Sequence, residues 1–149
     1  MVLSLATPSQ AHWADLAVAD IQIKTRAVDI SLTIPTGLID QFDDDKNQQL
    51  SETEVTTHQK DLQAVLNEKI RLTVAGVKSE TLIVKSNPIK KISSNLIATP
   101  NTHSSLLLQY QWSEPIDQLQ MHYDLFVPGV NTARCLAQVF RAGDRKSVV

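Results

Sequence analysis

Alternation of apolar and polar residues runs through most of the chain and predicts short β-strands. The pattern is clearest at Val28–Ile34, where apolar and polar residues alternate strictly, and an apolar run over 16–23 comes just before it. Further strand-like runs, separated by turn signals such as Ala75-Gly76, Asn87-Pro88 and Pro128-Gly129, lie at 70–74, 82–84, 96–98, 106–112, 119–127 and 137–139. Seven or eight short strands with regular turns are typical of an immunoglobulin-like β-sandwich, so we expect a mainly β (α+β) fold.

The period of the pattern changes from two residues to a helical spacing between the second and third strands. Thr36 is predicted to cap a short helix that ends near Phe42. Ser51 and Glu54 fit a capping box and predict the start of a second helix. Its apolar face consists of Val55, Leu62, Val65, Leu66 and Ile70. The sequence therefore predicts a helix-loop-helix inserted into the β-sandwich over residues 36–70.

Composition limits the classes of protein to which the chain can belong. Its 149 residues suit one domain, and 14 basic against 16 acidic residues give a net charge of -2. No basic excess is present to neutralise phosphates, so we expect no nucleic-acid partner. The single cysteine, Cys135, excludes an intramolecular disulfide and a cysteine-cluster zinc site. No apolar run is long enough for a membrane span.

The acidic residues gather in the predicted loop between the two helices. Six of the 16 lie between Asp40 and Glu54, where like charges repel unless a cation lies among them. From Asp43 the order D-D-D-K-N-Q-Q-L-S-E-T-E matches the twelve-residue calcium loop of an EF-hand. The predicted ligands of Ca²⁺ are Asp43, Asp45, Asn47, Gln49 through its backbone carbonyl, Ser51 and Glu54. Alternate residues of such a loop point at one centre, and the final glutamate closes the far side.

Two features of the loop predict weak binding. Position 6, normally glycine because the turn there needs a positive φ, is Gln48. No second calcium loop is visible, so the β-sandwich would have to brace a single hand. We expect a Kd on the order of 10⁻⁴–10⁻³ M. Glu54 would also have to divide its carboxylate between the capping box and the metal. The alternative is an acidic, solvated loop that holds no metal.

The first eleven residues resemble the end of a secretory signal. Val2, Leu3, Leu5 and Ala6 are apolar, and Ser9-Gln10-Ala11 fits a small-residue cleavage site. We expect residues 1–11 to be the remnant of a signal peptide and residues 12–149 to form the domain, which would be extracytoplasmic (periplasmic or secreted). The alternative is a frayed tail. Val148-Val149 resembles the start of another strand, so we expect the sequence to be a fragment of a longer chain.

No catalytic motif is recognisable in the sequence. The four histidines have no metal-ligand spacing, and there is no nucleophile elbow, P-loop or dinucleotide-binding glycine motif. Cys135 near a strand start is expected to be a small buried residue rather than a nucleophile. His12, as a new N-terminus, could hold a transition metal, but an exposed terminal residue is the simpler interpretation. We therefore predict that the domain is not an enzyme.

Several segments together resemble a known family. These are Ala11-His12-Trp13-Ala14-Asp15-Leu16, the two early strands, the Asp43–Glu54 loop and Tyr123-Asp124-Leu125-Phe126. They resemble the exported N-terminal region of bacterial membrane proteins of the HupE/UreJ type, in which a β-rich domain precedes a membrane region tied to nickel or cobalt transport. The resemblance implies a membrane region or a membrane-protein partner. The sequence contains no such membrane region, so transport activity is not carried over to it.

Two functions from different classes follow from the sequence. The first is calcium binding through one EF-hand in an exported, non-enzymatic domain, with a structural or weak sensor role. The second is a metal-free, immunoglobulin-like protein-interaction module of a larger membrane-associated protein, in which the loop is only an acidic surface. The protein partner is unknown in either case.

Overall fold

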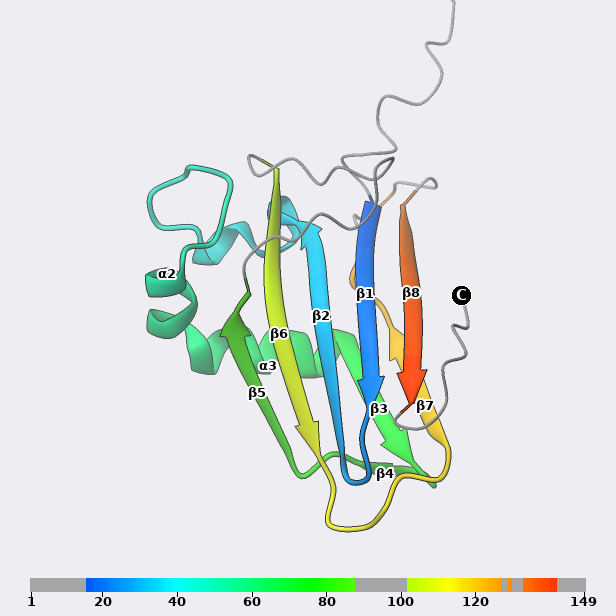
Figure 1. The fold of residues 1–149 in the computed structure, drawn as a ribbon. Coiled ribbons are helices and arrows are strands. Elements are labelled where there is room, and N and C mark those ends of the chain that lie inside the picture. Colours follow the sequence, from blue (N-terminus) through cyan, green and yellow to red (C-terminus); the bar gives the residue numbers. More distant parts are fainter. Residues whose placement is uncertain (1–15, 88–101, 127–128, 130–132, 142–149) are drawn as a thin grey trace, which may run out of the picture.

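The computed structural model describes residues 16–87, 102–126, 129 and 133–141 (Figure 1). Its larger sheet has five strands in the order β5-β6-β2-β1-β8. The bounds are β1 Leu16–Ile23, β2 Ala27–Pro35, β5 Thr81–Ser86, β6 His103–Gln111 and β8 Arg134–Arg141. All neighbouring strands are antiparallel except β1 and β8, which run parallel and pair from Leu16↔Arg134 to Ile23↔Arg141.

The alternating sequence of β2 explains why this sheet has one fully buried face. Val28, Ile30, Leu32 and Ile34 have no exposed surface, whereas the intervening residues lie on the opposite face. The register places Leu106, Leu108 and Tyr110 of β6 opposite these apolar residues, so the same face continues across the sheet. Burial of these side chains is the main stabilising contribution to the fold.

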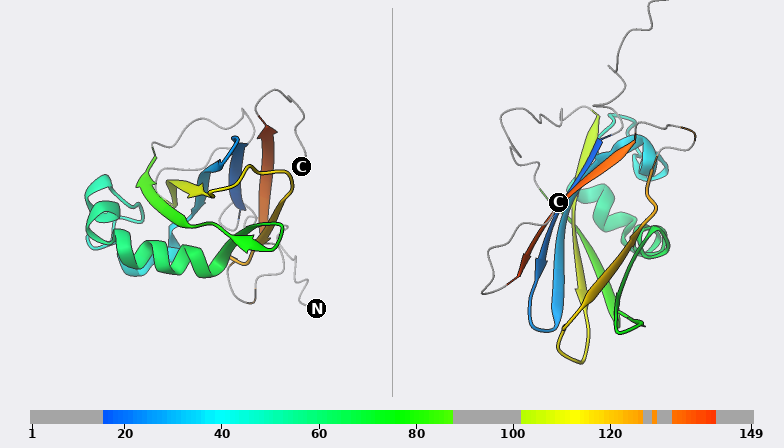
Figure 2. Two further views of the ribbon diagram at one scale, coloured as in Figure 1. Left: turned by 90° about the horizontal axis from the view of Figure 1, so that it is seen from below. Right: turned by 90° about the vertical axis from the view of Figure 1, so that its right-hand side faces the viewer.

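A smaller sheet and the helices cover that buried face (Figure 2). The smaller sheet has the order β4-β3-β7. Its strands are β3 Ile70–Val74, β4 Val77–Lys78 and β7 Leu119–Tyr123, and the helices are the 3₁₀-helix η1 Thr36–Phe42, α2 Glu52–Thr57 and α3 Gln59–Lys69. Leu62 and Leu66 of α3 and Ile70 of β3 join the core that the larger sheet forms. In the chain, all three helices lie between β2 and β3. This is the place where the spacing of apolar residues changes from alternating to helical and predicts them.

The structure confirms the prediction of a mainly β fold with some helix and corrects it in detail. Strand β4 was not predicted, because two residues are too short to show a period. Strand 96–98 lies outside the described residues. Thr36 does not cap η1: Pro35 is the N-cap, and the Thr36 hydroxyl bonds to that of Ser104 at 2.7 Å instead.

The second predicted helix is divided into α2 and α3 at His58. Thr56 and Thr57 come directly before the break, and β-branched residues favour helices poorly. The His58 ring also packs against Phe42, with ring centroids 5.5 Å apart. The helix is therefore interrupted at a residue that contacts η1, where the sequence pattern alone would continue one helix.

Candidate metal centre

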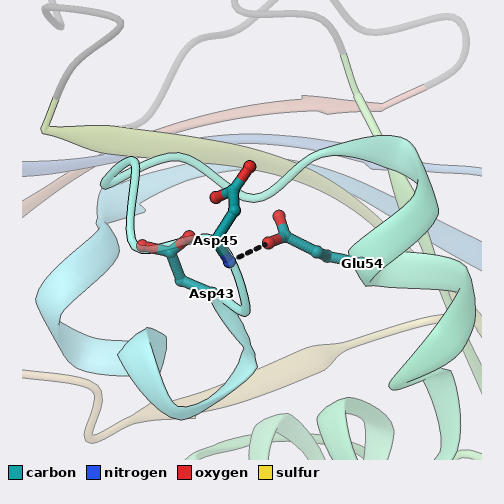
Figure 3. Close-up of side chains that lie close together, drawn as sticks. All are labelled: Asp43, Asp45 and Glu54. Atoms are coloured by element: carbon teal, nitrogen blue, oxygen red, sulfur yellow. Dashed lines mark hydrogen bonds between the residues drawn. The ribbon is translucent and has the colours of Figure 1, made fainter.

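The acidic loop, residues 43–54, runs from the end of η1 into the first turn of α2 and lies beside the start of β6 (Figure 1). Figure 3 shows Asp43, Asp45 and Glu54 gathered around one small space. One carboxylate oxygen from each of these residues lies within 4.8 Å of the others, the only such group of potential metal-ligating side chains in the described part of the chain. Three of the six predicted ligands therefore converge.

Asp43 has a buried oxygen without a hydrogen-bond partner. The residue is 3% exposed, and its Oδ2 accepts the backbone N–H of Gln48 at 2.9 Å. Its Oδ1 is buried and has no partner among the described residues. A buried, unpaired acceptor costs about 1–3 kcal/mol, and more when it is charged. A cation in the space would remove that cost.

Glu54 closes the opposite side of the space and is held by backbone donors. It is 6% exposed; Oε1 accepts the N–H of Asp44 at 2.8 Å and of Asp45 at 3.3 Å, and Oε2 accepts that of Ser51 at 2.8 Å. Ser51 Oγ accepts the Glu54 N–H at 3.2 Å, which confirms the capping box. Burial raises the pKa of Glu54, but these hydrogen bonds outweigh it and leave the pKa below its usual value.

The winding of the loop depends on two residues with positive φ. Lys46 has φ 57° and Gln48 has φ 67°, so Gln48 adopts the conformation that its position in the motif predicts. Asp45 Oδ1 accepts the Asn47 N–H at 3.2 Å, which lowers the pKa of Asp45, but desolvation and the neighbouring carboxylates Asp43 and Glu54 raise it more. The net pKa of Asp45 is therefore above its usual value, as expected where like charges are crowded.

The other three predicted ligands make local hydrogen bonds. Asn47 Oδ1 accepts the Gln49 N–H at 2.9 Å, and its Nδ2 donates to Asp45 Oδ2 at 3.1 Å. Ser51 Oγ is occupied by the capping box. Together with residues of β5 and β6, Asn47, Gln49 and Ser51 line a hollow of about 250 Å³. Their assignment as ligands stays a prediction.

The loop is attached to the larger sheet by a buried serine. Leu50 is 5% exposed, and its backbone N–H donates to Ser104 Oγ of β6 at 2.9 Å. A brace from the β-rich part of the domain was expected for a single hand, but Ser104 was not identified as part of it. No signal in the sequence could have found it, because Ser104 lies 54 residues away in an ordinary strand.

A second contact that the sequence did not predict ties the loop to the helices. His58 Nε2 lies 2.8 Å from Asp44 Oδ2 and forms a partly exposed ion pair when the imidazole is protonated. His58 therefore lies partly exposed at the surface and also links the loop to the helices. Asp44, the middle one of three consecutive aspartates and not a proposed ligand, thus has a partner of its own in His58.

The remaining candidates carry no chemistry that the described residues support. Burial raises the pKa of the Cys135 thiol to about 11, so the half-buried thiol stays protonated at neutral pH, as expected for an unreactive cysteine. His122 is exposed on β7. His12 and the signal-like residues 1–11 lie outside the described residues. Within the described part of the chain, no helix has the length and apolar character needed to cross a membrane.

Comparison with known proteins adds no relative. No family model, no curated protein and no solved structure matches this chain. The interpretation of the loop therefore depends on its own geometry.

Proposed function

We propose that the acidic loop is a single EF-hand that binds one calcium ion. The observation that carries the proposal is that the buried Asp43 Oδ1 has no hydrogen-bond partner among the described residues. The Asp43 carboxylate also lies close to those of Asp45 and Glu54. Oxygen-rich sets of this kind suit hard cations, and Ca²⁺ accepts six to eight oxygens in flexible geometry. Asn47, Ser51 and the Gln49 carbonyl would complete the set.

Electrostatics supports a divalent ion over an empty loop. Two of the three carboxylates are almost completely buried, where the screening of their mutual repulsion by water is weak. One Ca²⁺ would offset two of these charges. Mg²⁺ demands near-ideal octahedral geometry and gives up its water reluctantly, so the irregular loop favours Ca²⁺.

The same contacts support weak rather than tight binding. Bidentate ligation by Glu54 would compete with the backbone N–H groups of Asp44, Asp45 and Ser51, all of which its carboxylate already accepts. Gln48 also departs from the motif, which has glycine at this position. A Kd on the order of 10⁻⁴–10⁻³ M, the range of extracellular modules, follows.

The wider setting of the site is also a proposal. We infer an immunoglobulin-like β-sandwich with the EF-hand inserted at 36–70, exported from the cytoplasm and not enzymatic, in which calcium has a structural or weak sensor role. Two sheets sharing one core support the sandwich. The resemblance to the exported region of HupE/UreJ-type proteins supports the location and a membrane-associated partner or region.

A metal-free interaction module is the second candidate. The observation that favours it is that both oxygens of Glu54 already accept backbone hydrogen bonds from the loop and the capping box. In that case Glu54 serves the loop alone, and the acidic surface would meet a protein partner.

Thermal unfolding in calcium and in magnesium separates the two functions. For a Kd of about 1 mM, 10 mM calcium should stabilise the protein by about 1.4 kcal/mol and raise Tm by several degrees. Equal concentrations of magnesium control for ionic strength and should have less than half this effect. An identical Tm in both salts and in a chelator would favour the metal-free module.

A further inference from the structure

A second candidate binding site lies at the opposite end of the larger sheet from the acidic loop (Figure 1). It is a pocket of about 770 Å³ between the β3–β4 hairpin and the segment that connects β6 to β7. We call it the Trp112 pocket. Volumes of roughly 300–1,000 Å³ are typical of sites for small organic ligands.

Part of the lining of this pocket is apolar and is held in place by hydrogen bonds. Val74, Val77, Trp112 and Pro115 are its larger apolar residues, and Val77 is 62% exposed. The Trp112 indole N–H donates to the Val77 carbonyl at 3.1 Å and joins the two walls. The Trp112 backbone N–H also bonds to Arg26 O at 2.9 Å, which ties the wall to the larger sheet.

Carboxylates outnumber cations on the lining. Glu80, Glu114 and Asp117 line the pocket with a single cation, Lys78, which leaves three negative charges against one positive. Over residues 16–87, 102–126, 129 and 133–141, neither an ion pair nor a side-chain hydrogen bond engages these three carboxylates. The Arg141 guanidinium lies nearby but donates to the backbone carbonyls of Ile116 and Asp117.

This arrangement does not suit a metal ion. The three carboxylates are exposed and do not converge as those of Asp43, Asp45 and Glu54 do, the group that the described residues bring within ligand distance of one another. Nor does it suit an anion, which the excess of carboxylates would repel. Apolar lining residues beside three exposed carboxylates, which we call the rim carboxylates, complement a ligand with an apolar body and a positively charged end.

We propose that the Trp112 pocket binds an organic cation, an apolar group that carries a primary ammonium or a guanidinium. The apolar body would lie against Trp112 and Val77, and the charge would face the rim carboxylates. This proposal is independent of calcium binding at the acidic loop, because the two sites share no residue.

The test is a titration of ¹⁵N-labelled protein with 3-phenylpropylammonium, followed through the Trp112 indole and Val77 amide signals. The neutral 3-phenylpropanol has the same apolar body and controls for hydrophobic binding alone. We expect the ammonium to shift both signals and to bind at least about tenfold more tightly than the alcohol, as three partly screened charges can provide.

Matched variants test whether these carboxylates provide the added affinity for the ammonium. Replacing Glu80, Glu114 and Asp117 by Gln, Gln and Asn should reduce affinity for the ammonium about tenfold and leave affinity for the alcohol unchanged. Replacing the exposed helix acids Asp61 and Glu68 by Asn and Gln should change neither, and Glu54→Gln should bind the ammonium as the parent does. No shift at Trp112 and Val77, equal binding of alcohol and ammonium, or full affinity in the rim variant would overturn the proposal.

Discussion

Three carboxylates converge in the acidic loop and three line the Trp112 pocket, but their surroundings are opposite. Asp43 and Glu54 of the loop are 3% and 6% exposed and accept backbone N–H groups, whereas Glu80, Glu114 and Asp117 remain exposed beside apolar lining residues. Folding has already removed water from Asp43 and Glu54, and with the exposed Asp45 they lie close enough together to share one small cation. The hydrated pocket carboxylates suit a bulky cation whose apolar part supplies the remaining affinity.

The largest effect should come from removing the buried charge of Glu54. Glu54→Gln keeps the shape but loses a charged ligand and an acceptor for backbone N–H groups. We expect calcium affinity to fall at least about 100-fold and the free energy of unfolding without calcium to fall by about 1–3 kcal/mol. Calorimetry and urea unfolding measure the two quantities. The control is the exposed Glu52→Gln in the same helical turn; if Glu54→Gln binds calcium like the parent, the ligand assignment is wrong.

A smaller loss of affinity should follow when the exposed ligand loses its charge. Asp45→Asn keeps an oxygen for the metal but removes one of three charges, so we expect calcium to bind about tenfold more weakly. The variant also relieves repulsion from Asp43 and Glu54, which raises the pKa of Asp45. Its Tm without calcium should therefore equal or exceed that of the parent. A lower Tm in chelator would mean that the carboxylate is needed for the loop itself.

The bond between the loop and the sheet should matter more for stability than for affinity. Ser104→Ala leaves the buried Leu50 N–H without an acceptor and should lower the free energy of unfolding by about 1–3 kcal/mol. Calcium affinity should fall about threefold to fivefold, because the loop loses its brace but no ligand. Ser105→Ala is the matched control, since its hydroxyl accepts from Thr33 within the sheet. Equal calcium affinities in the two variants would show that Ser104 does not brace the loop for calcium binding.

The smallest effect, an expected gain in stability, should come from replacing Gln48 by glycine. Gln48 has φ 67°, which glycine adopts without the penalty that a side chain brings. Gln48→Gly should raise the free energy of unfolding without calcium by up to about 1 kcal/mol, since the cost of a left-handed residue is roughly 1–2 kcal/mol and the added freedom of the unfolded chain offsets part of it. Gln49→Gly, one residue later and without a positive φ, should lower that free energy instead. Matching free energies of unfolding for the two glycine variants would contradict the strain argument.

The sequence predicted the features that depend on neighbouring residues. Strict alternation in β2, the Ser51–Glu54 capping box and the left-handed Gln48 each follow from spacing within a few residues, and the structure contains all three. The convergence of Asp43 with Glu54 belongs to the same class, because the winding of a short loop brings its ends together. A short sequence pattern is sufficient to predict features whose residues lie close together in the chain.

Features that depend on distant segments were missed. The Leu50–Ser104 bond spans 54 residues, and the Trp112–Val77 bond that joins the walls of the pocket spans 35. Neither serine nor tryptophan at those positions carries a signal in the sequence. The break at His58 also depends on tertiary contacts, with Phe42 and Asp44, that override the helical period.

Calorimetric titration of the parent protein with calcium, after removal of metal by a chelator, tests the central claim most directly. We expect one site with a Kd on the order of 10⁻⁴–10⁻³ M and no heat from the Glu54→Gln variant over the same range. No heat from the parent up to about 10 mM calcium, well above that range, or equal heat from both proteins, would contradict the assignment of the acidic loop as a calcium site.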